Sequence, residues 1–277
     1  MKKIKLSIQE VQNESIELLD KIVRVCDQNH FTYYLAYGTL LGAIRHNGFI
    51  PWDDDVDIWM PRTDYNNLIH YFKMHSDSLY PIRLFTPEEE NYPYMIARVS
   101  DSRYKLQVSN EKPYGLGIFI DIYPLDGIGS NICIAKFLKR FANVLISMCF
   151  LSTRTKFQKY KTKSLIKYIL KYPLFLFSKI LGKRFFFTLI QFIADKQKYA
   201  NSKYVNCLVW GSDDGVKGIF MKSYFDKSIK HKFGKYEFTI PSNYHEILSQ
   251  LYGDYMKLPP EGERVGYHYT NAYKNLE

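Results

Sequence analysis

Cysteine is scarce in this chain, which has four cysteines among its 277 residues. They are Cys26, Cys133, Cys149 and Cys207. None of them has the C-x-x-C or C-x-x-H spacing of a zinc site, and thiols scattered so widely do not make a disulfide framework. We therefore expect reduced thiols in the core of a cytosolic protein.

Long hydrophobic runs are also absent, although 46% of the residues are apolar and 24% are charged. No stretch reaches the roughly 18 consecutive apolar residues of a membrane-spanning helix. The first residues carry charge, but residues 9–14 are polar except for Val11, where a signal peptide has its apolar core. The composition is that of a globular protein, and we expect neither a spanning helix nor a signal peptide.

Acidic residues are nearly missing from one segment. Residues 132–200 hold 15 Lys or Arg and one acid, Asp195, so this segment carries +14 while the net charge of the chain is +10. Its aromatic and aliphatic side chains alternate with Lys and Arg, which is typical of helices that lie on an anionic membrane. The alternative is that these helices pack on the core and present a solvated basic face. Because no nucleic-acid-binding motif accompanies the basic residues, we expect no nucleic acid partner.

The most informative feature that is present is a run of acids. Residues 51–57 read PWDDDVD, and in an extended strand Asp53, Asp55 and Asp57 point to the same side. Like charges so close together repel unless a cation lies between them, and the apolar neighbours on both sides raise the cost of burying that charge. Carboxylate oxygens suit Mg²⁺ or Mn²⁺. The alternative is a solvated acidic loop.

Another acid, Asp121, lies apart from this run, inside the apolar stretch of residues 115–125. A buried carboxylate without a partner is costly, so Asp121 should face a cation or an arginine. Two interpretations stay open: an aspartate in a salt bridge within the core, or a carboxylate that a neighbouring strand delivers to the metal cluster. Asp126, which follows Pro124, is expected in a turn.

The remaining pattern predicts an α/β protein. Ser7 and Glu10 have the spacing of a capping box, which predicts a helix that ends near Gln28. Further helices are expected at residues 39–45, 61–74, 242–253 and within 132–200, and strands at 31–36, 56–60, 82–85, 95–99, 105–108, 115–125, 229–233 and 236–240. Residues from 255 onward are expected to form an ordered loop.

Small residues precede the acids. Gly38 lets backbone amides approach phosphate oxygens, Thr39 adds a hydroxyl donor, and the helical turn that follows adds a positive end. Carboxylates that hold Mg²⁺ nearby neutralise the phosphate under attack and the leaving group. Together these features predict a polyphosphate site.

These motifs closely resemble the LicD family, whose known members include bacterial phosphocholine transferases; fukutin and fukutin-related protein have a related domain. The resemblance is carried by residues 37–45 (YGTLLGAIR), 51–57 (PWDDDVD), 119–127 (FIDIYPLDG) and 252–260 (YGDYMKLPP). It therefore brackets nearly the whole chain.

The resemblance implies a nucleotidyltransferase-like fold, a mixed sheet flanked by helices, with residues 1–131 as the catalytic core, 132–200 as a basic helical insertion and 201–277 completing the catalytic domain. It also implies transfer of a phospho-alcohol from a CDP-linked donor to a hydroxyl of a glycan or a lipid-linked oligosaccharide, with release of CMP. Because of the basic segment, we expect a cytoplasmic protein that lies peripherally at the inner face of the plasma membrane.

The resemblance also implies the roles of individual residues. Gly38 and Thr39 match the turn that contacts phosphate. The matching metal ligands are Asp55 and Asp57, with Asp53 beside them. Asp121 matches an acid that is either a ligand or the general base. Arg45 either stabilises phosphate charge or pairs on the Asp54 side, and residues 252–254 shape the site.

Two other functions use the same features. A true nucleotidyltransferase would move NMP to an acceptor and release pyrophosphate from the same carboxylates. A non-catalytic membrane-associated protein would bind the cation for structure alone. The identity of the transferred alcohol is left open, because a choline site needs an aromatic cage and the 24 tyrosines do not single one out.

Overall fold

A mixed sheet forms the centre of the computed structural model, which describes residues 3–107, 110–157, 165–211, 216–264, 266 and 272–275. The sheet has seven strands, and its main path runs β2-β3-β7-β5-β4, with β8 paired to β7 and β9 paired to β8. Their bounds are β2 Tyr34–Leu35, β3 Asp57–Pro61, β4 Ile82–Phe85, β5 Ala97–Asp101, β7 Ile118–Gly127, β8 Tyr204–Asn206 and β9 Phe220–Met221. Strands β3 and β7 run parallel, and the other pairs are antiparallel.

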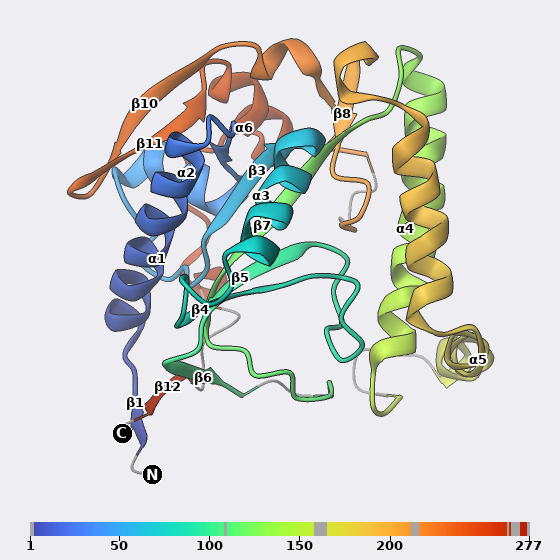
Figure 1. Cartoon of the computed structure of the whole chain (residues 1–277). Coiled ribbons are helices and arrows are strands. Elements are labelled where there is room, and N and C mark those ends of the chain that lie inside the picture. Colours follow the sequence, from blue (N-terminus) through green and yellow to red (C-terminus); the bar gives the residue numbers. More distant parts are fainter. Residues whose placement is uncertain are drawn as a thin grey trace.

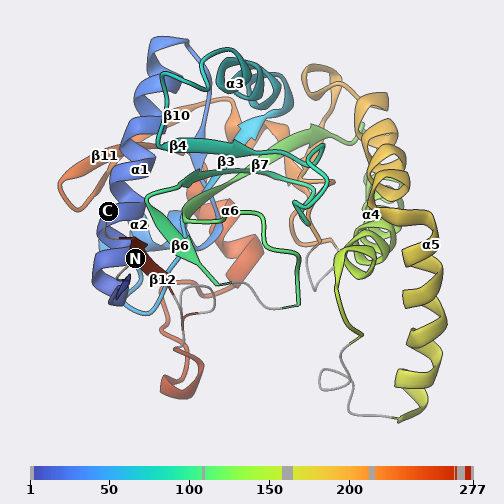
Figure 2. The same ribbon diagram turned by 60° about the horizontal axis from the view of Figure 1, so that its bottom comes forward.

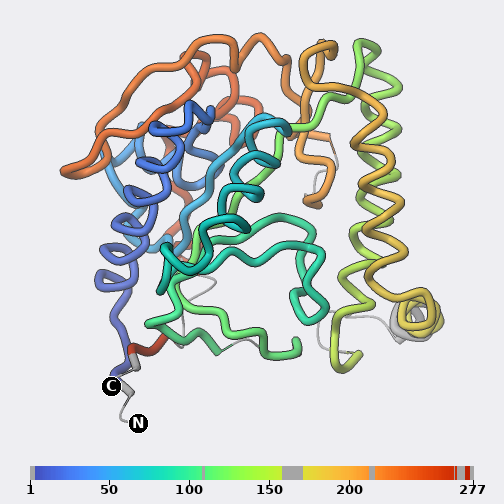
Figure 3. Tube along the Cα trace, viewed as in Figure 1, coloured from blue at the N-terminus to red at the C-terminus, as the bar shows by residue number. Residues whose placement is uncertain are grey.

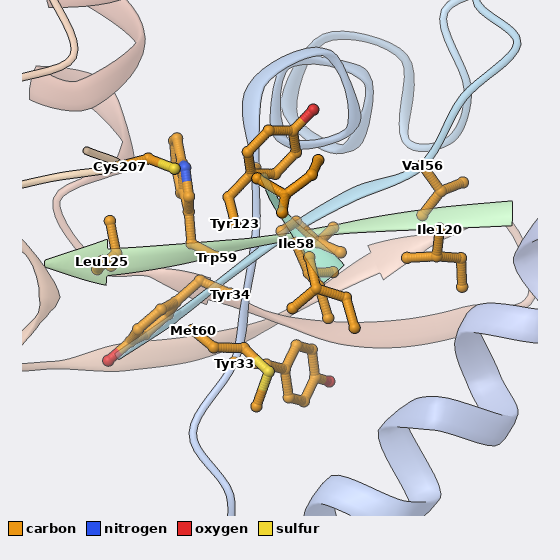
Figure 4. Packing of buried hydrophobic residues seen from close by; sticks show 14 of the residues in the cluster. Tyr33, Tyr34, Val56, Ile58, Trp59, Met60, Ile120, Tyr123, Leu125 and Cys207 are labelled. Carbon is orange, nitrogen blue, oxygen red and sulfur yellow. The ribbon is translucent and has the colours of Figure 1, made fainter. Parts of the chain in front are cut away.

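Strands β3 and β7 are buried along nearly their whole length. All ten residues of β7 are buried, as are the first four of β3. Strands covered on both faces read as continuous apolar runs, which is why these two segments lack the alternation of a half-exposed strand. Figure 4 shows Trp59 and Tyr123 on one side of these strands and Met60 with Tyr33 on the other.

Helices cover this sheet (Figures 1 and 2) and confirm the predicted α/β class. The four helices of the core are α1 Ile8–Gln28, α2 Tyr37–His46, α3 Arg62–Met74 and α6 Tyr244–Tyr252. The predicted capping box is present at the start of α1, where Ser7 and Glu10 satisfy each other's backbone amides. Helices α1, α2 and α3 each contact β3 or β7.

Two small sheets lie beside the central one. The predicted hairpin is confirmed as β10 Ser228–Phe233 and β11 Tyr236–Pro241. The second sheet has the order β1 Lys3–Lys5, β12 Ala272–Asn275 and β6 Tyr104–Leu106, so the two ends of the trace meet at one side of the molecule (Figure 3). The expectation of a loop to the end of the chain was therefore wrong at β12, a short strand whose pairing with β1 is too distant in sequence to predict.

Short 3₁₀ helices complete the described chain: η1 Tyr199–Asn201, η2 Lys222–Phe225 and η3 Glu261–Glu263.

Helices α4, Ile132–Thr153, and α5, Leu165–Lys196, pack against each other at one side of the sheet (Figures 1 and 2). Helix α5 is two helices joined at Gly182, whose φ of +72° is a left-handed conformation that suits glycine. After α5 the chain returns as β8, which pairs with the end of β7. None of the helices among the described residues is both long enough and apolar enough to cross a membrane.

The sequence suggested that Asp126 lies in a turn, but the structure shows otherwise. Asp126 belongs to β7 and is buried, where its Oδ1 accepts from Arg62 Nε at 2.6 Å and its Oδ2 accepts from the Leu208 amide at 3.1 Å. Pro124 fits this strand because the pairing of β7 with β5 ends at Ile122 and the pairing with β8 begins at Asp126. The missing amide of Pro124 therefore costs little.

Candidate active site

Two acids face each other across the parallel pair of central strands. Asp57 begins β3 and lies opposite Asp121 of β7 in the register. Their exposed fractions are 6% and 3%. Backbone pairing thus holds two carboxylates side by side in an apolar environment, where like charges are costly.

Arg98 of β5 balances one of these charges. Its Nε and Nη2 donate to the two oxygens of Asp121 at 2.5 and 2.7 Å. The guanidinium lies over the ring of Phe119 at 3.7 Å and over that of Tyr94 at 4.5 Å. The salt bridge expected of Asp121 is therefore present, with Arg98 as its partner. Asp121 also lies opposite Asp57, but its part in a metal cluster stays a prediction.

The other acids come from the loop before β3. Because β3 begins at Asp57, strand alternation does not bring the acids together, contrary to expectation. Carboxylate oxygens of Asp53, Asp54 and Asp55 instead lie within 4.8 Å of one another. Gln12 of α1 holds this loop, since its side-chain amide donates to the Asp53 carbonyl at 2.8 Å and to the Ile50 carbonyl at 3.4 Å.

The crowding changes the protonation of these groups. Burial, followed by the charge of Asp55, raises the pKa of Asp53 to about 8. Burial raises the pKa of Asp57 well above its usual range, and the charges of Asp55 and Asp121 add to this effect. The Oδ1 atom of Asp57 is buried and has no hydrogen-bond partner among the described residues. Oxygen ligands with excess negative charge and an unsatisfied buried oxygen fit a divalent cation.

Helix α2 supports the acids through its first turn. A Cβ atom at Gly38 would lie 2.6 Å from Asp53 Oδ2, so only glycine lets this carboxylate approach. The Thr39 hydroxyl is buried and accepts from the Asp57 amide at 2.9 Å. Gly38 and Thr39 are therefore next to the acids, as predicted, and each has a structural role there; their contact with phosphate stays a prediction.

Arg45 lies at the other end of α2. Its Nη1 donates to the carbonyls of Tyr255 and Lys257 at 2.9 and 3.4 Å, so it ties α2 to the loop that follows α6. The guanidinium of Arg45 was expected either to stabilise phosphate charge or to pair on the side of Asp54. In the structure its partners are these two main-chain carbonyls. A role toward phosphate stays a prediction.

A cavity of about 430 Å³ opens beside the acids. Its acidic part is lined by Asp55, Asp57 and Asp121 with Arg98, and its aromatic part by Tyr37, Tyr94, Tyr123, Trp210 and Tyr252. Tyr252 belongs to the motif that was expected to shape the site. The cavity also takes residues from segments that the sequence did not connect with it: Lys139, Asn206, Cys207 and Lys217.

Lys139 was missed because it stands in the basic helical segment. It is buried, and its Nζ donates to the carbonyls of Cys207 and Trp210 at 2.8 and 2.6 Å. Burial lowers the pKa of Lys139 to about 8. The sequence FLKRF offers no signal that separates this lysine from its solvated neighbour Arg140, so only the fold reveals it.

Convergent carboxylates, a helix beginning beside them and lysines in the same cavity are groups that suit a phosphate bound with a cation. On a mixed sheet, such a set of groups is typical of enzymes that transfer substituted phosphate groups. The family described as LicD/FKTN/FKRP, nucleotidyltransferase domain, matches residues 30–164.

The similarity to one curated protein extends over almost the full length. The chain is 32% identical over 271 residues to the lipopolysaccharide cholinephosphotransferase LicD of Haemophilus influenzae. The aligned residues cover 97% of this chain and 98% of that protein. The chain belongs to the LicD family, and it is a LicD-type transferase.

Two uncharacterised rickettsial proteins match smaller parts. That of Rickettsia typhi is 29% identical over 144 residues, or 45% of this chain and 44% of that protein. That of Rickettsia prowazekii is 42% identical over 59 residues, or 21% of this chain and 20% of that protein.

The raised pKa values predict how stability depends on pH. Asp53 and Asp57 have folded-state pKa values above their unfolded values, and that of Asp53 is about 8. The native state therefore holds an extra proton on Asp53 between about pH 4 and pH 8, and the raised pKa of Asp57 acts in the same direction. Their contribution to stability is complete at the acidic end and is lost as the pH rises toward 8. Without divalent cations, we expect Tm to fall by roughly 5 °C from about pH 5 to pH 8.

Thermal unfolding with EDTA, and then with Mn²⁺, measures this effect. Mn²⁺ should remove most of the fall, and Asp53→Asn should reduce it, whereas Asp77→Asn, an exposed acid outside the cluster, should leave it unchanged. A Tm profile that is the same with and without Mn²⁺ would contradict the cation site.

Proposed function

We propose that this protein transfers phosphocholine from CDP-choline to a hydroxyl of lipopolysaccharide or of its lipid-linked precursor, and that CMP is released. The observation that carries this proposal is the nearly full-length similarity to a protein named as a lipopolysaccharide cholinephosphotransferase. The cavity supports it, because acids that suit a cation and basic groups that suit a diphosphate line one space.

In this proposal Asp53, Asp55 and Asp57 hold Mg²⁺ or Mn²⁺. The ion, when bound, neutralises charge on the diphosphate as the bond to CMP breaks. The start of α2 faces the same region and favours negative charge through its backbone amides. We infer that Arg45 holds the loop after α6 in place, and its role toward phosphate stays a prediction.

Asp121 is a better candidate for a ligand or positioning group than for the general base. Both of its oxygens already accept from Arg98, which orients the carboxylate and leaves further lone pairs for a cation. Asp57 has a buried oxygen without such a partner among the described residues, and this oxygen is free to bind the ion.

A nucleotidyltransferase that releases pyrophosphate is the second candidate, since the matching family is described by that domain. The products separate the two functions: CMP and a phosphocholine-bearing glycan in one case, pyrophosphate and a nucleotide-bearing acceptor in the other.

We expect Asp57→Asn to lower CMP release from CDP-choline by more than about 100-fold, because it removes a charged ligand without changing the shape of the side chain. Asp77→Asn is the matched control and should retain full turnover. The measurement is CMP production with purified lipopolysaccharide as acceptor. Normal turnover by a folded Asp57→Asn variant would show that these acids do not carry the reaction.

We also propose that the core, residues 1–131 and 201–277, works at the inner face of the plasma membrane, and that the insertion, residues 132–200, binds an anionic membrane. Large apolar side chains on α4 and α5 are exposed, with Phe137 at 67%. On α4 they are spaced as one face: Ile134, Phe137, Phe141 and Val144. Such a patch on a protein surface indicates a binding face, and the exposed Lys136 and Arg140 beside it suit acidic headgroups.

Packing on the core explains the buried side chains of α4 and α5, but not their exposed apolar side chains. Their buried side chains, such as Ala142 and Ile190, contact the rest of the protein, and Lys183 donates to the carbonyls of Glu89 and Tyr92. The exposed apolar side chains, such as Phe137 and Val144 on α4, are not among these buried contacts.

Co-sedimentation with vesicles that contain about 30% phosphatidylglycerol tests this face. We expect the double substitution Phe137→Ser and Phe141→Ser to reduce binding about tenfold or more, and Lys136→Gln with Arg140→Gln to reduce it mainly at low salt. Arg24→Gln, an exposed cation on α1, should have no effect. Equal binding by all variants would remove the proposed membrane face.

A further inference from the structure

The aromatic part of the cavity has a geometry of its own. The rings of Tyr123 and Trp210 meet nearly at right angles, with centroids 5.5 Å apart and an interplanar angle of 78°. Tyr94 approaches Trp210 on another side at 6.1 Å. All three rings line the cavity that contains the acids. They form a corner of aromatic surfaces that opens into the cavity.

The strands place this corner one step from the acidic pair. Asp121 and Tyr123 are two residues apart on β7, and residues so spaced lie on the same face about 7 Å apart. The neighbouring strand repeats the arrangement with Asp57 and Trp59, which lie opposite Asp121 and Tyr123. An acidic layer is therefore followed by an aromatic layer on one face of the sheet, and Figure 4 shows Trp59 and Tyr123 on the same side.

Neighbouring groups hold the aromatic layer in place. The ring of Tyr37 packs edgewise on Trp59 and Tyr123, with centroids 4.8 and 4.9 Å away. Lys139 donates to the carbonyl of Trp210 and fixes the backbone that carries the indole. Because these contacts exist in the protein alone, little ordering is needed when a ligand enters.

We propose that Tyr94, Tyr123 and Trp210 form the subsite for the trimethylammonium group of the transferred phosphocholine. The inference rests on the proposed function, since it names the part of the same site that selects the transferred alcohol. The phosphate end of the ligand then lies over the acidic layer and the ammonium end over the aromatic layer.

The chemistry of the ligand fits this assignment. A quaternary ammonium has no N–H, so it cannot donate a hydrogen bond, but it binds well to the faces of Trp and Tyr. Ribitol or glycerol would bring hydroxyl groups against aromatic faces, where their hydrogen bonds to water are lost without replacement. Arg98 lies over one face of Tyr94, so Tyr123 and Trp210 supply the main surfaces and Tyr94 closes the side.

A series of donors tests the subsite on the unchanged protein. Affinity is measured by calorimetry for CDP, CDP-ethanolamine, its N-methyl and N,N-dimethyl forms, and CDP-choline. We expect affinity to rise with each methyl group, by about tenfold over the series. Equal affinities would overturn the subsite, because the aromatic rings would then not contribute to binding. Tighter binding of the forms that keep an N–H would also overturn it, because a carboxylate would then hold the ammonium.

Substitutions of Trp210 test whether the aromatic subsite causes the preference for CDP-choline over CDP-ethanolamine. Trp210→Leu should remove most of the tenfold preference for CDP-choline over CDP-ethanolamine while leaving the affinity for CDP unchanged, and Trp210→Phe should retain most of the preference. A preference unchanged in a folded Trp210→Leu variant would contradict the assignment. Should this variant not fold, the methylation series still decides.

The two proposals fail in different ways. A protein that releases CMP from CDP-choline but shows no dependence on methylation refutes the aromatic subsite and leaves the proposed function standing. A protein that releases no CMP from CDP-choline in the presence of Mn²⁺ and acceptor refutes the proposed function itself.

Discussion

Repulsion among buried carboxylates is the constraint on which the site depends. The parallel pairing of β3 with β7 sets Asp57 against Asp121, and the loop before β3 adds Asp53, Asp54 and Asp55. Folding an apolar core around this charge is unfavourable unless the charge is paired, protonated or bound to a cation. Arg98 balances Asp121, whereas burial and the neighbouring carboxylates raise the pKa values of Asp53 and Asp57.

Much of the surrounding structure holds this charge in position. Gly38 leaves room for the Asp53 carboxylate, the Thr39 hydroxyl anchors the start of β3, and Gln12 fixes the acidic loop to α1. These contacts come from helices at distant points of the sequence, so the arrangement exists before any ligand arrives. Because these carboxylates are already held in place, little reorganisation is needed when a cation binds to them.

The sequence predicted the positions of helices and strands better than it predicted how they pair and pack. Period and capping located α1, α3 and the hairpin, and buried runs located β3 and β7, because these signals are local. The acids lie close together, as expected, yet a loop and strand pairing bring them together rather than the alternation of one strand, and their role stays a prediction. Asp126 was misplaced because Pro124 is a turn signal that strand pairing overrides. Lys139 and Trp210 reach the cavity only through tertiary packing, which no local pattern encodes.

Anomalous diffraction from crystals grown with Mn²⁺ and CDP-choline tests the central claim most directly. We expect manganese bound to oxygens of Asp57 and of the loop acids at about 2.2 Å, with the donor's diphosphate on the opposite side of the ion. Manganese found elsewhere, or a donor bound with these carboxylates facing water and no ion between them, would contradict it.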